Sequence, residues 1–213
     1  MTDTDALKRL EHLVATQRPA DVPWTPVTDY SAAARDVVER PHAELILQHL
    51  VTEAYAERHV LDYGCGPDKH LVRNLERADY ERNDINHELS LYAYDPQIPG
   101  SDAHIDIYYD EAPYDLVICR EVLEHLTVRE VVTTVRELCR LGDRVYVTTR
   151  FNPDPSHLLD VMTSDDLDPT HITLLNQDFL RTLFVLEGFW RRSDLERIMD
   201  WREYGRVLVY ERA

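Results

Sequence analysis

The sequence predicts an open, doubly wound α/β fold, in which a mostly parallel sheet of seven strands carries helices on both faces and cap helices at its N-terminus. Three observations indicate this class. Short runs rich in β-branched and apolar residues alternate with segments of helical spacing from His59 onward. Most of these runs are apolar throughout, as expected of strands buried on both faces. Two glycines, Gly64 and Gly66, follow the first run and lead directly into a helical pattern.

The first 57 residues are predicted to form an N-terminal helical cap region, and residues 58–213 a single compact domain. Residues 4–16 place leucines and a valine on one helical face. A second helical region is expected from Ser31 to about Glu57, with an interruption near Pro41. Either these helices cap a ligand cleft, or they only cover one face of the sheet.

Alternating patterns define the rest of the chain. The seven strands are expected over residues 59–62, 91–95, 103–109, 114–120, 144–150, 189–192 and 206–211. The most regular helix runs from Thr127 to Leu141, and Gly142 is expected to end it. Residues 79–89 show no clear period and are predicted to be irregular. Only seven residues separate the second and third strands, too few for a helical crossover, which needs about a dozen.

Composition limits the partners and the compartment. With 23 basic and 40 acidic residues the formal charge is −17, so duplex nucleic acid is not an expected partner. The cysteines, Cys65, Cys119 and Cys139, show no metal-ligand spacing and are predicted to be buried reduced thiols of a cytoplasmic protein. No apolar run reaches membrane-spanning length, and the acidic, polar first residues do not resemble a signal peptide.

The carboxyl ends of the parallel strands are predicted to meet around one ligand crevice. Gly64 and Gly66 can adopt backbone angles closed to other residues, and they let a nucleotide-like ligand lie against bare backbone at a helix N-terminus. Asp95 ends the next strand, where its carboxylate either accepts two hydrogen bonds from a ribose diol or, with Pro96, only starts a turn. The residues predicted to contact the ligand here are Asp62, Tyr63, Gly64, Cys65, Gly66, Asp95, Pro96, Asp106, Arg120 and Glu121.

Three segments carry a family resemblance. VLDYGCGPDKHLVRNL (residues 60–75) resembles the first motif of class I S-adenosylmethionine-dependent methyltransferases, LYAYDP (91–96) resembles their second motif, and YDLVICREVLEHL (114–126) resembles their fourth-strand segment. The resemblance covers Val60 to Phe189 and implies a Rossmann-like fold with S-adenosylmethionine as cofactor. It implies that Asp95 binds the ribose, and that Asp62 either orders the turn or meets the methionine ammonium. Asp106 is expected either to accept from the adenine amino group or to be a surface aspartate.

One position departs from that family pattern. Asp68 stands where the motif has its third glycine. A negative charge at this turn would repel a phosphate, but S-adenosylmethionine has no phosphate and carries a sulfonium cation. The departure therefore argues against a dinucleotide more than against this cofactor.

Chemistry beyond cofactor binding is predicted for a Glu-x-x-Glu-His element. In a helical turn, Glu121, Glu124 and His125 project to one side, and His171 follows the long acidic loop. Such ligands can hold Mg²⁺, Mn²⁺ or a similar divalent ion. This order resembles two groups of metal-dependent O-methyltransferases, one acting on terminal 2′-hydroxyls of small RNAs and the other on catechols. The same string also occurs in methyltransferases that are not thought to bind a metal. On that alternative, Glu124 and His125 of this chain only begin a helix, and His125 or His171 is a candidate general base.

Three functions follow from these observations. The favoured one is O-methylation of a small molecule by S-adenosylmethionine, with or without a divalent ion. The second is a metal-dependent RNA ribose 2′-O-methyltransferase, which the net charge opposes. The third is a catalytically inactive relative of the same fold that binds the cofactor or acts as a scaffold.

Overall fold

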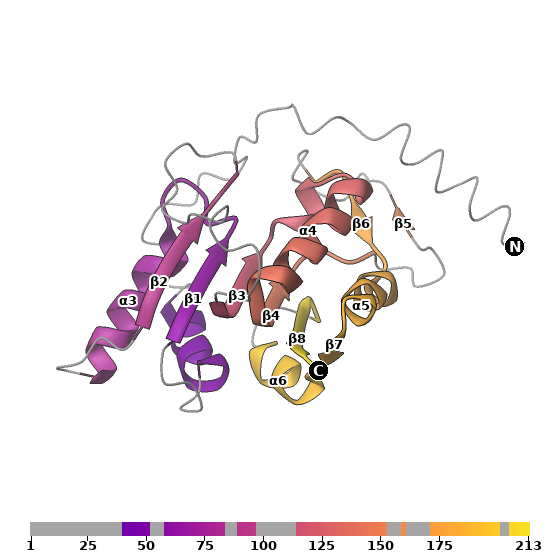
Figure 1. Cartoon of the computed structure of the whole chain (residues 1–213). Coiled ribbons are helices and arrows are strands. Elements are labelled where there is room, and N and C mark those ends of the chain that lie inside the picture. The colour runs from indigo at the N-terminus through magenta and orange to yellow at the C-terminus, as the bar shows by residue number, and fades with distance from the viewer. Residues whose placement is uncertain are drawn as a thin grey trace, which may run out of the picture.

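The structure is a computed structural model that describes residues 40–51, 58–83, 89–96, 114–152, 159–160, 171–200 and 205–213. Within these residues, six strands form one sheet in the order β2-β1-β3-β4-β8-β7 (Figure 1). They are β1 (Arg58–Tyr63), β2 (Leu89–Tyr94), β3 (Tyr114–Arg120), β4 (Gly142–Thr148), β7 (Phe189–Arg191) and β8 (Val207–Arg212). Two short strands, β5 (Leu159–Asp160) and β6 (Leu174–Leu175), pair separately.

Strand direction confirms the doubly wound class. Strands β2, β1, β3 and β4 are parallel, whereas β8 runs antiparallel to both β4 and β7. The chain crosses from β2 over β1 to β3, so the strand order reverses at β1, and ligands bind sheets of this kind at such a switch point. The seventh predicted strand, residues 103–109, lies outside the described residues.

Local capping signals mark the start of two of the helices, α4 (Val128–Leu141) and α5 (Gln177–Leu186). The other described helices are η1 (Ile46–Leu50), α3 (His70–Asn83), η3 (Leu123–His125) and α6 (Ser193–Met199). Thr127 caps α4 in a capping box with Glu130, whose carboxylate accepts from the Thr127 N–H at 2.8 Å. Asn176 caps α5 by accepting from the N–H groups of Asp178 and Phe179.

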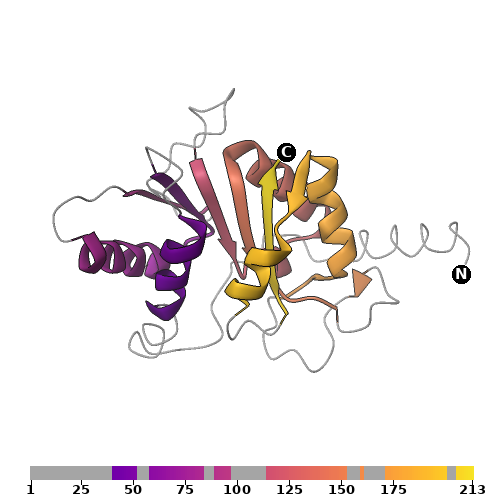
Figure 2. The same cartoon turned by 90° about the horizontal axis from the view of Figure 1, so that it is seen from below.

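Two apolar cores lie on opposite faces of the sheet, so the molecule has three layers. Alternate residues of β4 point to opposite sides: Val145 and Val147 pack with α4 and α5, whereas Tyr146 packs with η1, α3 and α6. Figure 2 shows the strands between the violet η1 and α3 segments and the orange α5. The described part of the predicted cap region, residues 40–51, therefore packs on a sheet face.

Several boundaries differ from the sequence prediction. Helix α3 continues to Asn83, so the prediction of irregular structure from residue 79 was wrong for its first five residues. Gly142 follows α4 immediately and starts β4, two residues earlier than predicted. Its backbone is extended (φ −129°), and a Cβ there would lie 2.6 Å from Cγ2 of Val117, so close packing is what requires this glycine. The predicted helices over residues 4–16 and 31–39 lie outside the described residues.

The cysteines are free thiols, as predicted, but only two of them are buried. Cys119 and Cys139 are buried, whereas Cys65 is partly exposed in the turn after β1, so the prediction of burial was wrong for Cys65. Among the described residues, no helix combines the length and the apolar character needed to cross a membrane.

Candidate functional site

The turn between β1 and α3 is fastened to the end of β2. Gly64 and Gly66 have positive φ angles of 86° and 64°, a region that favours glycine. The N–H groups of Gly64 and Cys65 both donate to the carbonyl oxygen of Tyr94, at 2.7 and 3.2 Å. The N–H of Gly66 donates to Oδ2 of Asp95 at 3.2 Å. The two segments predicted to hold the cofactor are therefore joined to each other directly.

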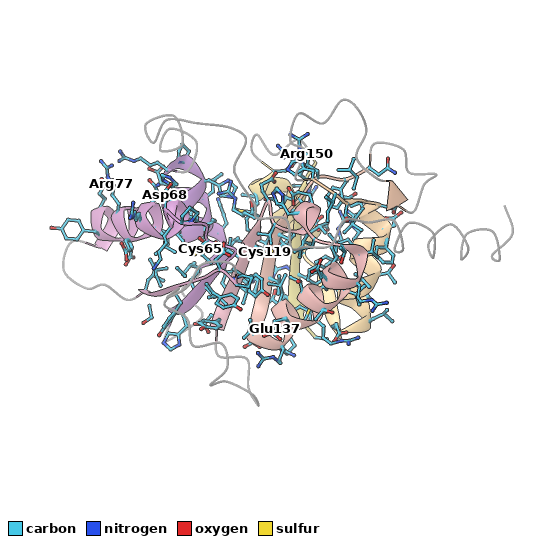
Figure 3. All side chains as sticks on the ribbon, turned by 90° about the horizontal axis from the view of Figure 1, so that it is seen from above. Cys65, Asp68, Arg77, Cys119, Glu137 and Arg150 are labelled. Carbon is cyan, nitrogen blue, oxygen red and sulfur yellow. The ribbon has the colours of Figure 1, made fainter. Side chains whose placement is uncertain are left out.

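The side chains around this turn are acidic and aromatic. Asp62 is buried on β1, and the rings of Tyr63 and Tyr94 pack with centroids 5.2 Å apart. Burial, together with the negative charges of Asp62 and Asp95, raises the pKa of the Cys65 thiol to about 11, so the thiol stays protonated near neutrality. Figure 3 looks onto this end of the sheet and labels Cys65 in the turn and Cys119 on β3. Pro96 is exposed after Asp95, and Asp106 lies outside the described residues.

The chain turns sharply at the carboxyl end of β3. Glu121 has a positive φ of 51°, which a non-glycine residue rarely adopts and which is common at functional sites. Its N–H donates to the carbonyl of Thr148 at 2.9 Å, and its Oε2 accepts from Nη1 of Arg206 at 2.9 Å. The helical turn η3 starts only at Leu123. The prediction that Glu121 shares one helical turn with Glu124 and His125 was therefore wrong.

Glu124 is fully buried. Its Oε2 accepts from the hydroxyl of Thr149 at 2.8 Å, and its backbone carbonyl accepts from the N–H groups of Ile172 (2.8 Å) and Thr173 (3.1 Å). Within the described part of the chain, no group donates a hydrogen bond to Oε1, and the Glu124 carboxyl group lies beside that of Glu121. Burial, and then the negative charge of Glu121, raise the pKa of Glu124 well above its ordinary value. The side chain is thus a buried carboxyl group whose protonated form is favoured.

Two histidines complete the group. The rings of His125 and His171 are 4.7 Å apart between centroids and meet edge to face at 60°. One ligand atom each of Glu124, His125 and His171 lies within 4.8 Å of the other two, and among the described residues these three form the group that can hold a metal. Three of the four predicted metal ligands therefore come together, whereas Glu121 lies outside the group and pairs with Arg206.

The turn and this group are neighbours. A Cβ built on Gly64 would lie 2.3 Å from Cγ2 of Val122, which stands between Glu121 and Leu123. The predicted cofactor-binding residues and the acid–histidine group, which is formed by Glu124, His125 and His171, thus occupy adjoining parts of the same sheet edge.

Comparison with known proteins assigns the family. The profile of the methyltransferase domain family matches residues 35–190, about three quarters of the chain. The chain belongs to this family. It is an S-adenosylmethionine-dependent methyltransferase with a Rossmann-like fold.

Solved structures of methyltransferases share this fold. One is the 1,6-didemethyltoxoflavin-N1-methyltransferase of Burkholderia thailandensis, whose structure contains 1,6-didemethyltoxoflavin and S-adenosylhomocysteine. It matches with a TM-score of 0.50 and 15% identity, over 99% of this chain and 89% of that one. A geranyl diphosphate methyltransferase in complex with S-adenosylmethionine matches with a TM-score of 0.51 and 12% identity, over 89% and 93% of the two chains. The comparison with curated protein sequences gives no match.

Sequence reasoning missed three residues that shape the site of this methyltransferase. Thr149 and Arg206 contact Glu124 and Glu121 from distant parts of the chain, and neither lies in a recognisable motif. His42 is buried and hydrogen-bonded to the hydroxyl of Tyr146 at 2.7 Å. Its pKa is lowered to about 2 by burial and then by the positive charge of Arg120, which places it near the end of β3. The apolar stripe of residues 43–51 was a usable signal for this packing, because it predicted a buried helix face.

Proposed function

We propose that this methyltransferase transfers the methyl group of S-adenosylmethionine to an oxygen of a small molecule. The observation that carries the proposal is the group formed by Glu124, His125 and His171 beside the glycine turn. A hydroxyl acceptor must lose its proton during the transfer, and imidazole, which titrates near neutrality, can take it. A small acceptor is also supported by the 1,6-didemethyltoxoflavin bound in the Burkholderia thailandensis N1-methyltransferase that shares the fold.

The cofactor is proposed to lie over the turn, with its sugar against Asp95. One oxygen of that carboxylate, Oδ2, accepts from the N–H of Gly66, which fixes the carboxylate at the edge of the crevice. A ribose diol can donate to a carboxylate held in this way. The buried carboxylate of Asp62 is proposed either to order the turn or to meet the methionine ammonium of the cofactor. The roles of Tyr63, Cys65, Pro96 and Arg120 stay predictions, as does that of Asp106.

We propose further that Glu124, His125 and His171 hold a divalent metal ion. The fit rests on Glu124, whose buried Oε1 receives no hydrogen bond from a donor within the described residues and whose proton, favoured by burial, a metal ion would replace. A metal with bonds of about 2.0–2.2 Å holds its ligand atoms roughly 3–4 Å apart, and the three ligand atoms here all lie within 4.8 Å of one another. When bound, the ion would polarise an acceptor hydroxyl and favour its deprotonation.

The donor set indicates which metal to expect. Two imidazoles and one carboxylate suit Mn²⁺, Fe²⁺, Co²⁺ or Zn²⁺, whereas Mg²⁺ prefers oxygen ligands and keeps several waters. The carboxylate of Glu121 adjoins Glu124 and gives its Oε2 to Arg206, but it is not one of the three residues whose ligand atoms converge, so the group lacks the second carboxylate that would favour Mg²⁺. The expected order of affinity is therefore the first-row transition metals above Mg²⁺.

Thermal shift with added metal tests this assignment. Mn²⁺ or Zn²⁺ at 100 times its dissociation constant should stabilise the protein by about 2.7 kcal/mol, and Mg²⁺ at the same concentration should stabilise it much less. Glu124→Gln should remove the shift, while Glu130→Gln, a carboxylate change in the α4 cap, should keep it. An equal shift in wild type and Glu124→Gln contradicts the metal proposal, and His125 or His171 then acts as a base without a metal.

The RNA alternative is distinguished by nucleic-acid binding. A chain with a formal charge of −17 should bind single-stranded RNA weakly even at low salt. A filter-binding titration at two salt concentrations measures this, with a basic RNA-binding protein as positive control. Tight, strongly salt-dependent binding would make an RNA ribose the preferred acceptor.

A further inference from the structure

The cofactor turn and the Glu121–His125 segment fit together at one point. Real Cβ atoms essentially never come within 3.0 Å of a heavy atom in a residue that is not their chain neighbour. A Cβ on Gly64 would lie 2.3 Å from Cγ2 and 3.4 Å from Cγ1 of Val122. The space between the backbone of Gly64 and the Val122 side chain therefore admits only hydrogen atoms. Gly66, two residues on, has nothing within 4 Å of its Cβ position. The close fit is specific to Gly64.

Two residues with left-handed backbone conformations, one after each of two neighbouring strands, bring Gly64 and Val122 together. Strands β1 and β3 pair in parallel up to Asp62 and Ile118, so both chains leave the sheet at the same edge. Gly64 turns the chain after β1, with φ of 86°, and Glu121 turns it after β3, with φ of 51°. The second turn points the side chain of Val122 at the first.

Backbone hydrogen bonds connect each partner of this contact to a further part of the site. On one side, the N–H of Gly64 donates to Tyr94, so the position of Gly64 fixes the turn against β2. On the other side, the carbonyl of Val122 accepts from the N–H of His125 at 3.1 Å. A shift of Val122 would therefore move both the cofactor turn and a histidine of the acid–histidine group.

We infer that Val122 is a positioning residue for methyl transfer. It holds the cofactor turn and the Glu124–His125 turn in a fixed relation, so that cofactor binding orders the residues proposed to face the acceptor. This inference rests on the methyltransferase family and its cofactor, and it holds whether or not a metal binds and whatever the acceptor is.

Steric compensation tests the contact. Gly66→Ala introduces backbone strain alone and should weaken S-adenosylhomocysteine binding by about tenfold, whereas Gly64→Ala adds a clash with Val122 and should weaken it by at least about a hundredfold. The double variant Gly64→Ala/Val122→Ala keeps only the strain and should return to about tenfold. Calorimetric titration of the four proteins measures this. A double variant that binds as weakly as Gly64→Ala would overturn the inference.

Hydrogen exchange provides a second test that does not require Gly64→Ala to fold. Saturating S-adenosylhomocysteine should protect the amides of His125 and Leu126 in the wild type and leave them unprotected in Val122→Ala. Val135→Ala, the same truncation in the buried face of α4, should lower the melting temperature while keeping that protection. Equal protection in Val122→Ala and wild type means that Val122 has only a packing role, and the inference fails.

Discussion

Thr149 donates its hydroxyl hydrogen to Oε2 of Glu124 over 2.8 Å, inside the protein and 25 residues away in the chain. Both side chains are buried, and no group in the described part of the molecule donates a hydrogen bond to the other oxygen of Glu124. The residue that follows strand β4 and the η3 turn are thus connected through a buried acid. Proteins seldom retain such a group without a use for it, because burying it costs free energy.

Replacing Thr149 should therefore be costly. Thr149→Val keeps the shape of the side chain but removes the hydroxyl, so that Oε2 of the buried Glu124 loses this hydrogen bond. We expect the free energy of unfolding to fall by about 1–3 kcal/mol. Thr133→Val, at an exposed position of α4 where the hydroxyl donates to the carbonyl of Arg129, should cost less than half as much. Urea denaturation measures both, and equal losses would show that the Thr149 bond has no special role.

The raised pKa of Glu124 predicts a pH dependence with a definite sign. Below pH 4.5, its ordinary pKa, the residue is protonated in both the folded and the unfolded chain. As the pH rises, the unfolded chain loses this proton while the folded protein keeps it, so stability falls by up to about 1.4 kcal/mol per pH unit. Glu124→Gln should abolish this loss in metal-free buffer. Denaturation midpoints from pH 4.5 to 8 that fall equally in both proteins would contradict the prediction.

His42 predicts the opposite dependence at lower pH. Its pKa is near 2 in the folded protein and about 6.5 in the unfolded chain, so below pH 6.5 only the unfolded chain takes up the proton. Stability should therefore fall as the pH is lowered from 6.5, by up to about 1.4 kcal/mol per pH unit. His42→Gln should reduce this slope. Tyr146→Phe removes the hydrogen bond but keeps the buried imidazole, so it should retain the slope. Parallel curves for His42→Gln and wild type would show that another group is responsible.

Most of the fold could be predicted because its signals are local. The glycine turn, the apolar strands and the Thr127 cap each lie within a few residues, and the structure places β1, β3 and α4 within two residues of their predicted bounds. The misplaced boundaries have packing causes. Gly142 is needed beside Val117, a contact between distant segments that no local pattern encodes.

The candidate site was only partly predictable, for the same physical reason. The spacing of Glu124 and His125 gave two of the three members of the acid–histidine group, and His171 was found because it closes the long loop. Glu121 was misplaced because a left-handed backbone at a non-glycine residue overrides the helical spacing that the motif suggests. Its partner Arg206 lies 85 residues away, and such an ion pair has no sequence signal.

The most direct measurement is a calorimetric titration of S-adenosylhomocysteine into the wild-type protein, Asp95→Ala and a control. Asp95 accepts from the N–H of Gly66 at the proposed ribose site, whereas Asp115 accepts from the N–H of His59, near the opposite ends of the parallel strands. Wild type and Asp115→Ala should bind alike, and Asp95→Ala should bind at least about a hundredfold more weakly, since it loses the charged acceptor for both ribose hydroxyls. No binding by the wild type, or equal binding by Asp95→Ala, would contradict cofactor binding at this turn.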